Sequence, residues 1–266
     1  MTLKPQSLRA HVARKIVERL KLGPYCDRLL LGAVPRPWYG HCVFHATWLA
    51  RKLGYPAISI IEFGVAGGNG LLCLEQHAGE IEPAFGISIH IYGFDTGHGL
   101  TAPCDFRDLP YAWKAGDYPM DQGTLRQRLR RAQLIIGDVR QTIEEFYECY
   151  KPPPVGAVIF DLDLYSSTKS ALTVLAAPVD RLLPRVFCYF DDIIGYPLQT
   201  YNDRTGERLA IAEFNGQSEN RYLAVSNMFR GYLPEYWHQQ IYVCHLFDHP
   251  EYTTNVVPEQ MTLSLR

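Results

Sequence analysis

The sequence predicts an α/β protein built on a doubly wound, mostly parallel sheet. Two observations lead to this fold class. Apolar, β-branched segments alternate with segments of helical spacing along most of the 266 residues, and residues capable of chemistry follow the apolar segments directly. Strands this apolar need helices on both faces of their sheet, and right-handed crossovers then wind the chain on both sides. Ligands of such sheets bind at the carboxyl ends of the strands.

The expected elements follow in order along the chain. Helical spacing over residues 7–22 and 41–53 predicts an N-terminal helical segment, bounded at residues 1–56, before a main domain of residues 57–266. Runs of β-branched and aromatic residues predict strands at 57–64, 88–95, 132–138, 155–163, 185–192 and 239–247. Helical periodicity predicts helices at 69–78, 122–131, 139–150, 166–183 and 205–216. Prolines at 152–154 mark a break after the 139–150 helix.

The composition limits the partners and the compartment. The net charge is −2, which gives no reason to expect nucleic acid or an anionic membrane surface as a partner. The seven cysteines are scattered and include no Cys-x-x-Cys pair, so we expect neither a disulfide framework nor a structural zinc site. The N-terminus lacks the apolar core of a signal peptide, and no stretch is long enough to span a bilayer. We therefore expect a cytoplasmic protein.

The first predicted strand ends in a glycine-rich loop, "EFGVAGGNG" at residues 62–70. Its glycines let the backbone turn tightly and approach a ligand, and the following helix points free N–H groups into the same space. A dinucleotide fingerprint fails, because Ala66 and Asn69 stand where G-x-G-x-x-G needs glycine. Asp95 and Asp138 end the next two strands, where one can meet ribose hydroxyls and the other an exocyclic amine. Singly each could be a helix cap, but together they favour an adenosyl ligand.

Four aspartates follow the fourth and fifth predicted strands. Asp161 and Asp163 have the same parity, so a strand that continues to residue 163 places both on one face. Asp191 and Asp192 end the next strand and share a pocket with Asp161 if the two strands are neighbours. Carboxylates that close must protonate or bind a cation, and all-oxygen ligands favour Mg²⁺ over Zn²⁺. Asp163 then has another role, or its negative charge stabilises the N-terminus of the next helix.

Six motifs extend these observations: "GFDTGHGL", "YAWKAGDY", "IIGDVRQTI", "FDLDLYSSTKSAL", "FDDIIG" and "TGERLAIAEF". In order and spacing they resemble the metal-dependent sugar O-methyltransferases of the macrocin O-methyltransferase family. The resemblance implies a seven-stranded, Rossmann-like class I methyltransferase fold, with S-adenosylmethionine and Mg²⁺ as cofactors of residues 57–266. It implies a small-molecule acceptor, a sugar or a glycosylated natural product, and it suggests a homodimer. The 1–56 segment and the 96–121 loop are candidates for a lid.

The same resemblance implies roles for individual residues. Asp161, Asp191 and Asp192 would bind Mg²⁺, and Asp163 would be the catalytic base. The cofactor would contact Glu62, Gly64, Val65, Ala66, Gly67, Gly68, Asp95, Asp138, Val139 and Asp161. His98 departs from the family pattern and is the alternative base. Ile193 and Ile194 stand where some members carry a histidine base, which favours Asp163.

Two other functions stay open at this stage. A catechol-type O-methyltransferase uses a similar acid triad with an aromatic diol. A non-catalytic adenosyl-binding protein would need the glycine loop but not four intact aspartates. His41 and His45 have a metal-ligand spacing on one helix face but no third ligand, so a surface or lid role is expected. The aromatic stretch 233–240 can line an acceptor pocket or pack in the core.

Overall fold

The computed structural model describes residues 8–197, 199–231 and 235–257. Within them the chain forms one seven-stranded sheet in the order β3-β2-β1-β4-β5-β7-β6. The strands are β1 (Ala57–Phe63), β2 (Ser88–Asp95), β3 (Gln133–Ile136), β4 (Val155–Phe160), β5 (Leu182–Phe190), β6 (Arg221–Val225) and β7 (Ile241–Leu246). Strand β7 runs antiparallel to both of its neighbours, and the other paired strands are parallel. The predicted seven-stranded, mostly parallel sheet is confirmed.

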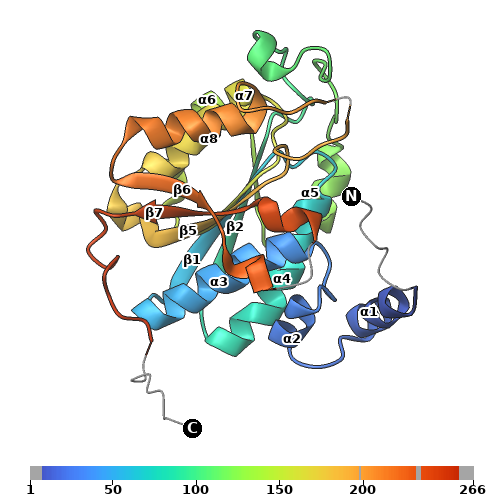
Figure 1. Cartoon of the computed structure of the whole chain (residues 1–266), viewed down its shortest axis with the longest axis vertical. Coiled ribbons are helices and arrows are strands. Elements are labelled where there is room, and N and C mark those ends of the chain that lie inside the picture. The colour runs from blue at the N-terminus through green and yellow to red at the C-terminus, as the bar shows by residue number, and fades with distance from the viewer. Residues whose placement is uncertain (1–7, 198, 232–234, 258–266) are drawn as a thin grey trace.

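Helices cover both faces of this sheet. The helices of the described residues are α1 (Leu8–Leu20), α2 (Tyr25–Leu30), α3 (Pro37–Leu53), α4 (Asn69–Phe85), α5 (Gln122–Arg128), α6 (Val139–Tyr150), α7 (Tyr165–Ala171) and α8 (Gly206–Gln217). Figure 1 shows α6, α7 and α8 on one side of the sheet and α3 and α4 on the other. Successive strand residues therefore enter different cores: Ile60 packs with the α3 and α4 side chains, and Ile61 packs on the opposite face.

Strand β6 and the segment after α7 differ from the sequence prediction, and helix α2 was not predicted. Strand β6 was not predicted, because this short edge strand contains Arg221 and leaves Tyr222 about half exposed, so it lacks an apolar run. The helix predicted over 166–183 ends at Ala171 and continues as 3₁₀ turns. Pro178 accounts for the end of these turns at Ala176, because proline disfavours helical geometry at the residue before it.

Helix α3 packs directly on the sheet. Its buried residues Tyr39, Val43 and Leu49 share one core with Ile58 and Ile60 of β1. A division at residue 56 would therefore separate α3 from the strands that it covers. The 1–56 segment as a separate unit, and its role as a lid together with the 96–121 loop, remain predictions.

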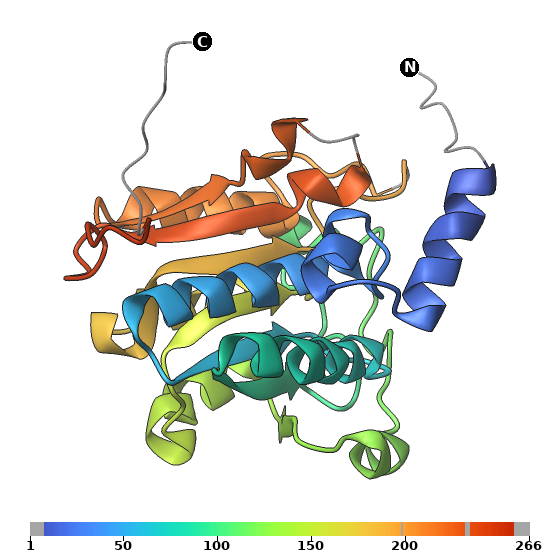
Figure 2. The ribbon, with the colours of Figure 1, turned by 90° about the horizontal axis from the view of Figure 1, so that it is seen from below.

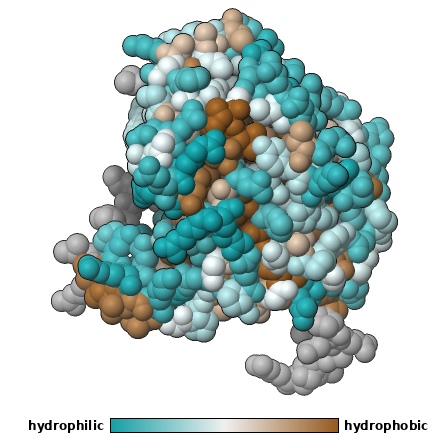
Figure 3. Space-filling model, turned by 180° about the vertical axis from the view of Figure 1, so that it is seen from behind, coloured by the Kyte–Doolittle hydropathy of each residue, from teal (hydrophilic) through white to brown (hydrophobic). Residues whose placement is uncertain are grey.

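Helix α1 stands apart from the body of the protein (Figure 2). Its side chains Val12, Ile16 and Leu20 are each about half exposed, as is Leu22 just beyond it. Figure 3 shows an apolar patch near the N-terminal residues, at the lower left of that face. The predicted homodimer remains a prediction. None of the described helices has the length and apolar character that a bilayer span requires.

Candidate active site

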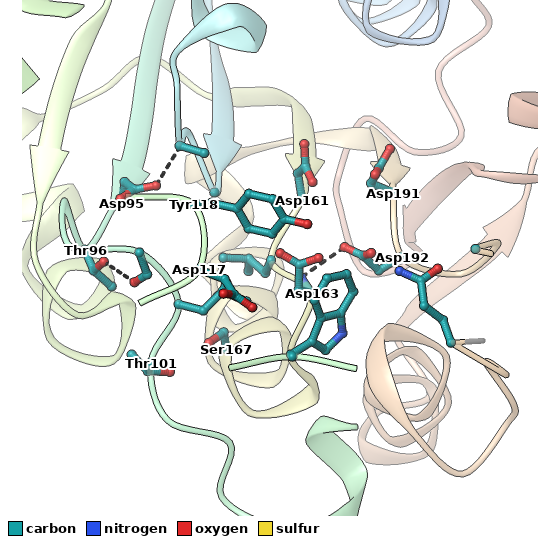
Figure 4. A pocket seen from close by; sticks show the side chains of 18 of the residues that line it. Asp95, Thr96, Thr101, Asp117, Tyr118, Asp161, Asp163, Ser167, Asp191 and Asp192 are labelled. Carbon is teal, nitrogen blue, oxygen red and sulfur yellow. Dashed lines mark hydrogen bonds between the residues drawn. The ribbon is translucent and has the colours of Figure 1, made fainter. Parts of the chain in front are cut away.

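Three aspartates meet at the carboxyl edge of the sheet (Figure 4). Asp161 follows β4, and Asp191 and Asp192 follow β5. The two strands are parallel neighbours with Phe160 opposite Phe190, so the residues that follow them emerge side by side. One carboxylate oxygen from each aspartate lies within 4.8 Å of the others. The predicted shared pocket of Asp161, Asp191 and Asp192 is therefore present, and we call these three residues the acid triad.

Hydrogen bonds from neighbouring strands hold two members of the triad. The Asp161 N–H donates to the Phe63 carbonyl at 3.0 Å, and the Asp191 N–H donates to the Phe160 carbonyl at 3.0 Å. The Tyr189 hydroxyl donates to Asp191 Oδ1 at 2.5 Å. The two backbone bonds continue the sheet ladder one residue past each strand. They fix the backbone from which the Asp161 and Asp191 carboxylates extend.

Asp192 is held by a separate network from the far side of the site. Its Oδ1 accepts a hydrogen bond from the Tyr201 hydroxyl at 2.8 Å, and its Oδ2 accepts one from the Asp163 N–H at 3.0 Å. Its own N–H donates to Glu207 Oε2 at 2.9 Å. Glu207 is completely buried on α8, and the sequence reasoning missed it as a site residue. The motif "TGERLAIAEF" contained it, but nothing in one sequence marks it as a support for Asp192.

Asp163 reaches the site by a route that differs from the prediction. Strand β4 ends at Phe160, so the predicted alternation along a strand to residue 163 is wrong. Asp163 instead has a left-handed backbone with φ 61°, a conformation that aspartate tolerates better than most residues. The resulting turn aims its N–H at Asp192 and leaves the side chain buried beside the triad (Figure 4).

Burial and mutual repulsion dominate the electrostatics of these acids. Burial, and then the Asp191 carboxylate, raise the pKa of Asp161 well above its usual value. The same two causes raise the pKa of Asp192 to about 6. Burial, followed by the Asp192 charge, raises the pKa of Asp163 to about 9. The ligand atoms that the triad offers are all carboxylate oxygens, so the triad fits a hard divalent cation. The charge of such a cation would favour the ionised forms of these aspartates.

The acid triad opens into a cavity of about 700 Å³. The glycine loop, the 96–121 loop, the segments that follow β4 and β5, and the residues before β7 also contribute lining residues. Six carboxylates line it: Asp95, Asp117, Asp161, Asp163, Asp191 and Asp192. Lysine, arginine and histidine do not occur among the described lining residues. Such a wall favours cationic occupants.

Several lining residues were missed by the sequence reasoning. They include Trp113, Asp117 and Tyr118 of the 96–121 loop and Tyr196 and Gln199 after β5. The motif "YAWKAGDY" held the first three, but a long loop has no periodicity from which side-chain direction follows. Within the aromatic stretch, both predicted alternatives occur, since Tyr236 and Gln240 line the cavity and Trp237 is buried in the core. Leu233 and Pro234 lie outside the described residues.

Asp95 organises the glycine loop. Its Oδ2 accepts hydrogen bonds from the Val65 N–H at 3.0 Å and the Ala66 N–H at 2.8 Å. Gly64, Ala66 and Asp95 line the large cavity, whereas Val65, Gly67 and Gly68 do not line either of the cavities at this edge. Gly68 has φ 81°, and a Cβ there would lie 2.2 Å from a Leu125 methyl group. The structure thus explains Gly68 by protein packing, without reference to a ligand.

Glu62 lies behind the glycine loop. Its side chain is 1% exposed and accepts a hydrogen bond at Oε1 from the Tyr39 hydroxyl at 2.9 Å, and its Oε2 has no partner. Burial raises the pKa of Glu62 to about 8. Glu62 is not a lining residue of either cavity. Its predicted cofactor contact thus remains a prediction, and its observed bond joins β1 to α3.

A smaller cavity of about 270 Å³ adjoins the large one, and the two share Asp95, Thr96, Thr101, Leu162 and Ser167. Asp138 and Val139 line the smaller cavity. Asp138 is the N-cap of α6, where it accepts from the Arg140 N–H at 2.9 Å and also pairs with the Arg140 guanidinium. Asp138 and Val139 thus stand at a pocket next to Asp95, as an adenosyl ligand spanning both cavities would require.

The histidines singled out in the sequence lie away from the triad. His41 is buried between Phe229 and Trp237, so the expected surface position is wrong. The His41 ring packs against these two aromatic rings, and burial lowers the pKa of His41 to about 3. His98 is exposed and lines neither cavity. Of the two predicted bases, only Asp163 lies at the triad.

The chain was compared with known proteins. No protein-family model and no curated protein matches it. Among solved structures, that of CalS11, a calicheamicin methyltransferase, matches with a TM-score of 0.54 and 19% sequence identity, over 93% of this chain and 95% of that chain. The O-methyltransferase NovP matches with a TM-score of 0.49 and 13% identity, over 79% of this chain and 90% of that chain. At this identity the CalS11 match establishes a shared fold.

Proposed function

We propose that the chain is an S-adenosylmethionine- and Mg²⁺-dependent O-methyltransferase that acts on a hydroxyl of a sugar or a glycosylated natural product. The observation that carries this proposal is the acid triad, whose oxygens lie within 4.8 Å of one another in a cavity lined also by the glycine loop. The fold shared with a calicheamicin methyltransferase agrees with methyl transfer as the reaction.

The cofactor would occupy the two adjoining cavities. Gly64, Ala66 and Asp95 would hold it from the large cavity, and Asp138 and Val139 from the small one. Val65, Gly67 and Gly68 would act from behind by keeping the loop in shape, and contact of Glu62 with the cofactor remains a prediction. When bound, S-adenosylmethionine would supply the methyl group as a sulfonium, and Mg²⁺ would orient the acceptor and lower the pKa of its hydroxyl.

The chain's own residues perform three tasks in this proposal. Asp161, Asp191 and Asp192 hold the cation, and Tyr189, Tyr201 and Glu207 keep two of those carboxylates in place. Asp163 accepts the proton of the acceptor hydroxyl, because it lies beside the triad with its N–H on Asp192. The walls of the cavity hold the acceptor in line with the methyl group, so most of the rate enhancement is positional.

Calorimetry tests the proposal without knowledge of the acceptor. S-adenosylhomocysteine and Mg²⁺ should each bind, and EDTA should reverse only the Mg²⁺ signal. Asp191→Asn and Asp192→Asn should remove Mg²⁺ binding, because an amide replaces a charged ligand by a neutral one, and should leave S-adenosylhomocysteine binding in place. Asp180→Asn is the matched control, since Asp180 is an exposed aspartate outside both cavities. Binding of NAD in place of S-adenosylhomocysteine would show that the cofactor is wrong.

A further inference from the structure

Two buried polar atoms on the cavity wall have no hydrogen-bond partner. Trp113 is 8% exposed and Gln240 is 2% exposed, and both line the large cavity. The Nε1–H of Trp113 and the Oε1 of Gln240 are unpaired, although Gln240 Nε2 donates to the Asp191 carbonyl at 2.7 Å. Buried polar groups are nearly always paired. Less than 1 Å² of either atom is exposed, so a ligand in the cavity pairs with them once the Trp113 and Gln240 side chains turn toward the space that they line.

Asp117 also lines the large cavity, and its negative charge is not required to bind either cofactor. The triad would neutralise a divalent cation, and Asp95 is satisfied by loop N–H groups. Asp117 Oδ2 accepts a hydrogen bond from the Lys114 N–H at 3.0 Å, which adds no cation. Figure 4 shows the Asp117 side chain turned toward Asp163 and Ser167. Asp117 thus adds a further negative charge to a cavity that is already acidic.

An aromatic corner stands beside Asp117. The Trp113 and Tyr118 rings lie 6.3 Å apart between centroids at an interplanar angle of 58°, and both residues line the cavity. Such rings pack against the C–H face of a pyranose and attract a nearby ammonium group. A phosphate or diphosphate would be repelled by the carboxylates, because the described lining residues include no basic side chain to pair with it.

We propose, on the basis of the methyltransferase function above, that the acceptor is an amino sugar whose ammonium group is held by Asp117. The sugar ring lies against Trp113 and Tyr118, one ring oxygen or hydroxyl accepts from Trp113 Nε1–H, and a hydroxyl donates to Gln240 Oε1. The site discriminates by charge: it favours an ammonium over a hydroxyl at that position and rejects phosphorylated or nucleotide-linked sugars.

Three monosaccharides that differ mainly in charge test this inference. Protein loaded with S-adenosylhomocysteine and Mg²⁺ is titrated with D-glucosamine, D-glucose and D-glucose 6-phosphate. Glucosamine should bind about tenfold more tightly than glucose, the usual scale for one charge-assisted hydrogen bond, and glucose 6-phosphate should bind most weakly. Any other order, or no measurable binding of glucosamine, overturns the inference. Failure of the loading step would instead count against the methyltransferase function itself.

Variants then assign the preference to one side chain. Asp117→Asn should remove the preference for glucosamine over glucose, whereas Asp180→Asn should retain it. Trp113→Phe keeps an aromatic ring but lacks the indole N–H, so it should weaken both sugars by a similar factor. An unchanged preference in Asp117→Asn would show that another group holds the ammonium. The order found for the wild-type protein remains decisive even if a variant does not fold.

Discussion

Gly64→Ala should destabilise the protein by about 2–5 kcal/mol. Gly64 has φ 84°, and an alanine in that region costs about 1–2 kcal/mol. The added methyl group would lie 1.7 Å from the Asp161 carbonyl oxygen, so the ends of β1 and β4 must separate. The hydrogen bond from the Asp161 N–H to the Phe63 carbonyl is then lost, and its buried groups left unpaired cost about 1–3 kcal/mol more.

Gly67→Ala is the matched control for this prediction. Gly67 lies in the same loop, has no positive φ, and has no atom within 4 Å of the position of an added Cβ. Its replacement should change stability by no more than about 1 kcal/mol. Urea denaturation measures both variants, and Mg²⁺ calorimetry should show weakened binding in Gly64→Ala alone, because Asp161 moves. Equal stability of the two variants would refute the contact between Gly64 and Asp161 as the reason for glycine at residue 64.

The remaining predictions concern the acids. Asp163→Asn should lower kcat by about 10²–10⁴-fold with S-adenosylmethionine and Mg²⁺ binding retained; wild-type turnover would exclude Asp163 as the base. In metal-free protein the contribution of Asp192 to stability should be fully present below about pH 4 and be lost as the pH rises through about 6, because its raised pKa lets the folded state bind a proton more tightly than the unfolded state. Denaturation from pH 4 to 8 tests this, and Mg²⁺ should restore stability at pH 8. Glu207→Ala should weaken Mg²⁺ binding by leaving the Asp192 N–H unpaired, whereas Glu207→Gln, which keeps an oxygen acceptor, should weaken it less.

Sequence and structure agree best for residues that directly follow a buried strand. The apolar run before Asp161 and the apolar run before Asp191 each required a buried strand, and parallel neighbours required their ends to meet. The acid triad could therefore be predicted before any coordinates. The glycine loop and Asp95 followed in the same way, since both stand directly at strand ends.

Asp163 lies beside the triad, as predicted, but the strand alternation from which this position was predicted does not extend to it. Alternation along a strand applies only while the backbone stays extended, and β4 ends three residues before Asp163. A left-handed turn then brings the side chain to the triad. Local pattern carries no information about such a turn, because its stability depends on Asp192, which is 29 residues away.

The sequence by itself determined the parallel sheet, the order of the acids and the edge at which they gather, because burial and strand alternation act over neighbouring residues. Only the tertiary structure decided that Glu207 supports Asp192, that Glu62 bonds to Tyr39, and that Trp113, Asp117 and Gln240 line one cavity. These contacts join residues from loops and helices far apart in the chain. Their positions depend on how the covering layers pack on the sheet, which no local pattern specifies.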